Sequence, residues 1–88
     1  MNDYLLTFEL DKDESALHVC TDIQGLEELI SQLSSLLEWA KNDKTEHIHL
    51  MTEGWGSGEL SSEPQIGKVI NHVKVYCWNG RQREEKTK

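Results

Sequence analysis

The sequence predicts an α+β domain, in which a four-stranded, mainly antiparallel sheet carries one long helix packed on one face (ββαββ). Segments that alternate apolar and polar residues are typical of strands, and one segment repeats apolar residues every three or four positions, as a helix does. A helix with an apolar stripe has to bury that stripe against an apolar sheet face, which gives the two layers.

An amino-terminal hairpin is predicted from residues 4–10 and 15–20, with a polar turn at residues 11–14. Both segments alternate in the period of two that a half-buried strand requires. The side chains expected to point inward are Leu6, Phe8, Leu10, Leu17 and Val19.

The helix is the clearest element of the sequence. Thr21-Asp-Ile-Gln24 fits a capping box, in which Thr21 accepts from the first-turn amides and Gln24 reaches back. About five helical turns follow and end near Lys41–Lys44, where cations suit the carboxyl end of a helix. The apolar stripe that we expect to be buried consists of Leu26, Leu29, Ile30, Leu33, Leu36, Leu37 and Ala40.

Two more strands are predicted, at residues 46–51 and 68–78, and an antiparallel and a mixed sheet both remain compatible with them. Residues 1–80 then form a single domain, and residues 81–88 form a charged tail that we expect to be disordered. Alternation divides the last strand into Val69, Val73, Val75 and Cys77 on one face and Ile70, His72, Lys74, Tyr76 and Trp78 on the other.

The charge of the chain restricts its partners. The net charge is −7, and residues 1–80 hold 14 acidic residues against five lysines. Such a surface repels phosphate backbones and attracts a basic protein, so we expect no nucleic acid partner. No signal-like amino terminus and no apolar run of roughly 20 residues occurs, which predicts a cytoplasmic protein without a membrane partner. Cys20 and Cys77 are expected to be free, buried thiols.

The Gly-rich connection of residues 52–67 is too long for a simple hairpin turn, and such connections are usually functional or ordered by their own side chains. Its glycines resemble a phosphate cradle, but no lysine and no helix follow them. Ser57 also lies outside a Gly-x-Ser-x-Gly elbow. Trp55 and Leu60 are therefore expected either to plug the fold or to contact a partner.

All four histidines are predicted on the open face of the sheet, opposite to the helix. His47, His49 and His72 could share a metal ion, but no cysteine or carboxylate completes the shell. We predict no cofactor and no metal, and a His-based metal-binding module remains an alternative. No nucleophile–base pair is apparent either, so we expect a binding protein and not an enzyme. The fourth histidine is His18.

The same open face also carries large amphipathic side chains, among them Tyr76 and Trp78, with Ile70 and Leu5 beside them. A sheet covered by one helix leaves this face wet, or covers it by dimerising, or offers it to a partner. A small structural, homodimeric interaction domain is therefore a second alternative.

The segment His49-Leu-Met-Thr-Glu-Gly-Trp-Gly-Ser-Gly-Glu-Leu-Ser-Ser-Glu-Pro64, followed by Val69-Ile-Asn-His-Val-Lys-Val-Tyr76, resembles immunity protein family 32 of the bacterial polymorphic toxin systems. The resemblance covers roughly residues 47–78, about the carboxyl-terminal third. It implies an α+β protein that binds and neutralises a cognate toxin, and it carries over no catalytic or cofactor residue.

Charge and resemblance together predict an immunity protein whose partner is a protein toxin, such as a basic nuclease, with a homodimer also compatible. Tyrosine and tryptophan commonly carry interface energy, and carboxylates suit a basic partner. The residues expected to bind the partner are Glu53, Trp55, Glu59, Leu60, Glu63, His72, Tyr76 and Trp78.

Overall fold

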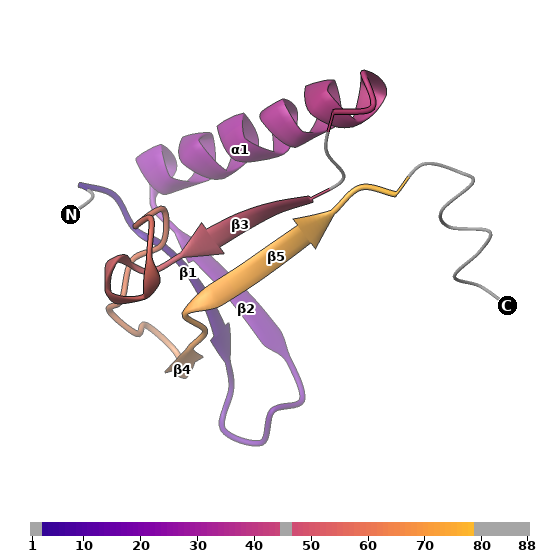
Figure 1. Cartoon of the computed structure of the whole chain (residues 1–88). Helices are drawn as coiled ribbons and strands as arrows, with labels where there is room; N and C mark the ends of the chain where they lie inside the picture. The colour runs from indigo at the N-terminus through magenta and orange to yellow at the C-terminus, as the bar shows by residue number, and fades with distance from the viewer. Residues whose placement is uncertain (1–2, 45–46, 79–88) are drawn as a thin grey trace, which may run out of the picture.

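A computed structural model of the chain describes residues 3–44 and 47–78 and has the predicted α+β character (Figure 1). The predicted tail and Glu46 lie outside these residues. No helix in the described part of the chain has the length and apolar character needed to cross a membrane. The elements are β1 (Leu6–Leu10), β2 (Leu17–Thr21), α1 (Ile23–Lys41), β3 (His47–Met51), the 3₁₀ helix η1 (Glu53–Trp55), β4 (Lys68–Val69) and β5 (His72–Tyr76).

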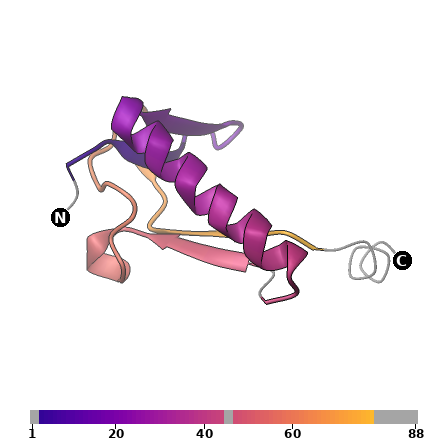
Figure 2. The same ribbon diagram turned by 90° about the horizontal axis from the view of Figure 1, so that it is seen from above.

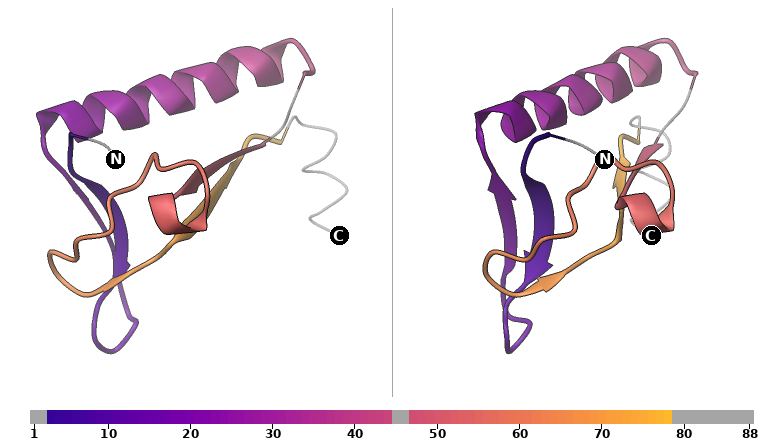
Figure 3. Two further views of the ribbon diagram at one scale, coloured as in Figure 1. Left: turned by 60° about the vertical axis from the view of Figure 1, so that its left-hand side comes forward. Right: turned by 90° about the vertical axis from the view of Figure 1, so that its left-hand side faces the viewer.

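The prediction of one four-stranded sheet is wrong, because the described strands form two antiparallel sheets, β2-β1-β4 and β3-β5. The predicted last strand divides at Ile70 and Asn71. Before the break, the Ile70 N–H donates to the carbonyl oxygen of Phe8 at 2.8 Å, whereas the Asn71 carbonyl oxygen accepts from the Thr52 N–H at 3.0 Å. Each half of the segment thus pairs with a different strand, and the two sheets diverge below α1 (Figure 3).

Helix α1 begins one residue later than a Thr21 cap would place it. Thr21 is the last residue of β2, paired with Leu6, and Asp22 is the N-cap. The Asp22 Oδ1 atom accepts from the Gly25 N–H at 2.7 Å. The predicted capping box therefore names the wrong residue as the N-cap. Thr21 pairs with Leu6 in the hairpin, so the next polar residue, Asp22, caps the helix.

The core lies where the inner faces of the two sheets meet one side of α1. Ile48 and Leu50 of β3 are buried as predicted, and Val73 and Val75 of β5 pack against them. The buried apolar residues are Leu6, Leu36, Ile48, Leu50 and Leu60, and Tyr4, Phe8, Leu29, Val73, Val75 and Cys77 pack around them. Cys20 and Cys77 are free thiols that are only half-buried.

Much of the surface that the sequence predicts to be buried is exposed. Only Leu36 of the helix stripe is fully buried, and Leu29 is partly buried. The diverging sheets touch α1 along one side, and in Figure 2 the β1–β2 hairpin extends beyond the helix that crosses it. The predicted inward residues that stay exposed are Leu17, Val19, Leu26, Ile30, Leu33 and Leu37.

Candidate functional site

The open face of the β3–β5 sheet carries five aromatic rings in one continuous row. Strand register places them together, since His47 pairs with Tyr76 and Met51 pairs with His72. Neighbouring ring centroids are 4.9–5.3 Å apart. We call this surface the ring row, and its members in spatial order are His72, His49, His47, Tyr76 and Trp78.

A hydrogen bond joins two of the histidines. The His49 Nδ1 and His72 Nε2 atoms are 2.8 Å apart, so one nitrogen donates its proton and the other accepts. His49 also stands opposite Lys74 in the β3–β5 ladder. The pair thus holds both rings in place only while at least one of the two nitrogens is unprotonated.

The pKa of His49 is lowered from its usual value of 6.5. Burial of the ring is the largest cause, followed by the positive charges that His47, His72 and Lys74 would place beside an imidazolium. The folded protein therefore takes up this proton less readily than the unfolded chain.

We expect the protein to lose stability as the pH falls through 6.5 toward the lower pKa of folded His49, because the unfolded chain then binds the proton more tightly. Above pH 6.5 this effect disappears. Urea unfolding at pH 7.5 and pH 5.5 measures it, and His49→Gln should show a smaller decrease than wild type. An equal decrease in both proteins would contradict the assignment to His49.

The ring row is open to solvent in its middle and at one end, since His49 is exposed and Tyr76 and Trp78 are 45% and 38% exposed. At its other end, His72 pairs with Met51, and η1 follows Met51 along the chain. A Cβ atom on Gly56 would lie 2.8 Å from the Met51 sulfur, so the turn packs tightly onto the open face at Met51. Trp55, in this turn, is 62% exposed. The turn thus carries a further large, exposed aromatic side chain beyond the Met51 end of β3.

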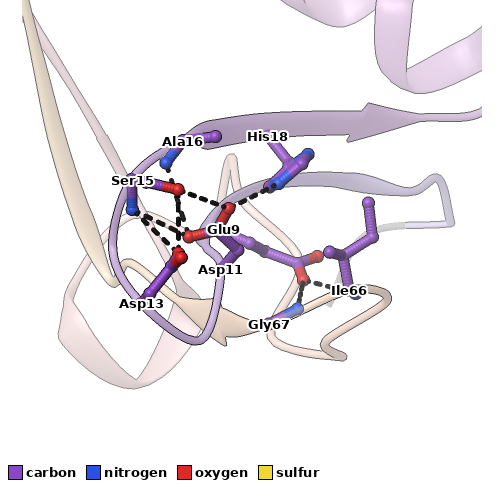
Figure 4. A network of polar contacts seen from close by, with 8 residues as sticks. All are labelled: Glu9, Asp11, Asp13, Ser15, Ala16, His18, Ile66 and Gly67. Atoms are coloured by element: carbon purple, nitrogen blue, oxygen red, sulfur yellow. Dashed lines mark hydrogen bonds and ion pairs between the residues drawn. The ribbon is translucent and has the colours of Figure 1, made fainter.

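The connection of residues 52–67 is ordered by Glu9, whose carboxylate is fully buried (Figure 4). Its Oε1 atom accepts from the backbone N–H groups of Gln65, Ile66 and Gly67 at 2.7–3.0 Å. The Thr7 hydroxyl donates to Oε2. Burial alone would raise the pKa of Glu9, but these hydrogen bonds outweigh it and lower the pKa from 4.5 to about 2.

The middle of the connection is fixed to β1 and β3. The Ser61 hydroxyl accepts from the Leu6 N–H at 3.0 Å and donates to the Tyr4 carbonyl oxygen at 2.8 Å. The Leu60 N–H donates to the Met51 carbonyl oxygen at 3.0 Å, and the Leu60 side chain is only 2% exposed. Leu60 therefore plugs the fold.

The remaining predicted contact residues differ in accessibility. Glu53 and Glu63 are exposed. Glu59 is half-buried, and its Oε1 atom accepts from the Met51 N–H at 3.1 Å and from the Ser57 hydroxyl. Leu60 lies in the core and cannot contact a partner, so it does not belong to the candidate surface. Of the predicted set, His72, Tyr76 and Trp78 lie in the ring row.

His18 does not join the other histidines, so the prediction of four histidines on one sheet face is wrong. It lies on β2, in the other sheet, with its Nε2 atom 3.6 Å from the Asp11 carboxylate (Figure 4). The division of the strands into two sheets causes this separation. Within residues 3–44 and 47–78, no group of three or more His, Cys, Asp or Glu side chains is placed to hold a metal ion.

The comparisons with known proteins give no match: no family model, no curated protein and no solved structure is similar to this chain at a significant level. The resemblance to the immunity protein family thus depends on the motif residues alone.

Proposed function

We propose that the protein is a non-catalytic immunity protein of the cytoplasm, which binds and neutralises a basic protein toxin of a bacterial polymorphic toxin system. The binding surface is the ring row together with Trp55. The observation that carries the proposal is the ring row itself, because adjacent, half-exposed aromatic side chains are typical of the centre of a protein interface.

Charge supports a basic partner. The net charge of −7 attracts a cationic protein over a distance of about one Debye length, roughly 8 Å at physiological salt. The exposed carboxylate of Glu53 stands in η1 with Trp55 and adds an acidic group to this surface. The association rate constant should accordingly fall as salt is added, more steeply than the dissociation rate constant changes.

The order of the 52–67 connection also supports a binding role. Binding costs less conformational entropy when a loop already has its bound shape. Hydrogen bonds to Glu9, Leu6 and Met51 fix this connection at several points while Trp55 stays at the surface. A rigid support below an exposed tryptophan is the arrangement that a preorganised contact requires.

Co-expression with the product of the neighbouring open reading frame tests the proposal. We expect that product to arrest growth alone, to be harmless with this protein, and to purify with it as a complex. A neighbour that is harmless when expressed alone would contradict the proposal.

Two variants in the same connection separate contact from fold. Trp55→Ala should weaken toxin binding by at least tenfold and leave the melting temperature unchanged, because its side chain is largely exposed. Leu60→Ala should lower the free energy of unfolding by about 2–4 kcal/mol, because it opens a cavity in the core. Binding is measured by calorimetry and unfolding by circular dichroism.

Trp39→Ala is the matched control for the tryptophan, since Trp39 is also partly exposed, at 41%, but lies on α1. We expect this control to bind the toxin as wild type does. Equal losses in the Trp39 and Trp55 variants would argue against the ring row and Trp55 as the contact surface.

A further inference from the structure

One side of α1 carries a second apolar surface that neither sheet covers. Its residues recur at intervals of three, four, three and four positions and are between 40% and 79% exposed. Burial of large apolar side chains drives association as it drives folding, so a surface of this kind is a candidate interface. We call it the α1 seam, and it consists of Ile23, Leu26, Ile30, Leu33 and Leu37.

The seam is confined to one strip of the helix. At 100° per residue, its centre lies about 110° around the helix axis from the buried Leu36 and Gly25. Exposed polar side chains occupy the strip beyond it, among them Gln24, Ser31 and Glu38. The apolar arc of α1 is therefore wider than the part that the two sheets cover.

The β1–β2 hairpin extends this apolar surface. Leu17 and Val19 pair with Leu10 and Phe8, and paired residues of antiparallel strands point to the same side of a sheet. They thus stand on the face that holds the core, yet they are 55% and 47% exposed. Strand β2 is at the edge of its sheet, and Figure 2 shows the hairpin extending past α1.

We propose that a second copy of this chain docks on the α1 seam and on Leu17 and Val19, with the two α1 helices antiparallel across a two-fold axis. This dimer leaves the β3–β5 open face and Trp55 outside the interface. It is thus independent of the proposed toxin contact.

The available area fits a dimer. The seven side chains are 40% to 79% exposed and offer on the order of 600 Å² of apolar surface. A two-fold interface would therefore remove roughly 1,200 Å², the lower limit for specific complexes. A two-fold interface uses the same patch twice and needs no second complementary surface. Alternating intervals of three and four residues are also the pattern by which two nearly parallel or antiparallel helices pack side chains between one another.

Charge favours the antiparallel orientation. All the charged side chains in the first turns of α1 are acidic, and two parallel helices would place them against each other. In an antiparallel pair, each acidic end lies beside the partner's carboxyl end, where acidic and basic residues balance, and the helix dipoles also oppose. The charged residues are Asp22, Glu27 and Glu28 at the first end and Glu38, Lys41, Asp43 and Lys44 at the second.

The test compares lysine substitutions at two adjacent residues. Ile30 belongs to the α1 seam, whereas Ser31 is exposed on the polar strip. In light scattering coupled to size exclusion at high micromolar concentration, wild type and Ser31→Lys should have twice the chain mass, and Ile30→Lys should have the monomer mass. Circular dichroism confirms that each variant is folded.

If Ile30→Lys does not fold, Leu17→Lys on the hairpin takes its place and should also yield a monomer. A wild-type protein that has the monomer mass at every concentration overturns the proposal, and the α1 seam would then be a candidate contact for a different protein. A dimer in whichever of these two lysine variants folds overturns it as well, because the interface would then lie elsewhere. None of these measurements needs the toxin, so a failure here leaves the proposed function untouched.

Discussion

Replacement of Glu9 with alanine is expected to lower the free energy of unfolding by about 3–5 kcal/mol, a large part of the stability of a small domain. The carboxylate is fully buried and accepts from the N–H groups of Gln65, Ile66 and Gly67. Alanine would leave these three donors without their acceptor. Urea unfolding followed by circular dichroism measures the loss.

Glu9→Gln refines this experiment, because the amide has nearly the same shape but no charge. Hydrogen bonds to a charged acceptor are about twice as strong as neutral ones, so we expect an intermediate loss of roughly 2 kcal/mol. Glu63→Gln is the control: this carboxylate lies in the same connection but is exposed, and its removal should change stability by less than about 0.5 kcal/mol. Similar values for the two glutamine variants would contradict the anchoring role of Glu9.

The pH dependence of Glu9 gives an independent measurement. Its pKa falls from 4.5 to about 2 on folding, so the unfolded chain binds the proton at the higher pH. The stabilisation is complete above pH 4.5 and is lost as the pH falls toward 2; it amounts to roughly 3 kcal/mol at most. Between these pH values, wild type should lose stability more steeply than Glu9→Gln.

Period-two alternation predicts which way the side chains of β1 point, but it does not predict what covers them. It correctly places Leu6 inward and puts Thr7 and Glu9 on the other face. That face is buried too, because the chain returns 56 to 58 residues later and lays residues 65–67 across it. A carboxylate inside an apolar strand is the one local sign of this anchor, and its partner is a distant backbone segment.

The division into two sheets leaves only a weak sign in the sequence. The alternation of residues 68–78 is interrupted where Ile70 and Asn71 stand on the faces opposite to their polarity, but no proline or glycine marks the break. Which strand each half pairs with depends on contacts distant along the chain. Within β5, after the break, the predicted faces are correct: His72 and Tyr76 lie on one side of the sheet, and Val73 and Val75 lie on the other. The sequence therefore predicts that the side chains of the ring row share one face.

For Trp55 and Leu60, residue type does not predict whether the side chain is buried or exposed. Both are large apolar residues in one Gly-rich connection, yet one is 62% and the other 2% exposed. The difference arises from the backbone, because Leu60 forms a parallel bridge with Thr52 that directs it into the core. Sequence alone leaves both roles open for both residues.

A methyl group at Gly25 should disrupt the junction between α1 and β1. A Cβ atom there would lie 1.7 Å from the carbonyl oxygen of Leu5 and 2.7 Å from its carbonyl carbon. Both are backbone atoms, so no side-chain rotation relieves the overlap. The same oxygen accepts from the Asp22 N–H at 3.2 Å, and Asp22 caps the helix. Relief therefore requires the start of α1 to move away from β1.

Two opposing effects decide the outcome of Gly25→Ala. Alanine favours a helix over glycine by about 1 kcal/mol, whereas a backbone overlap of this size exceeds the usual overpacking cost of 1–3 kcal/mol. We expect a net loss of at least 2–3 kcal/mol in urea unfolding. Gly54→Ala is the matched control, because its Cβ would meet nothing within 4 Å, and it should leave stability unchanged. A stabilised Gly25→Ala protein would show that α1 does not lie this close to β1.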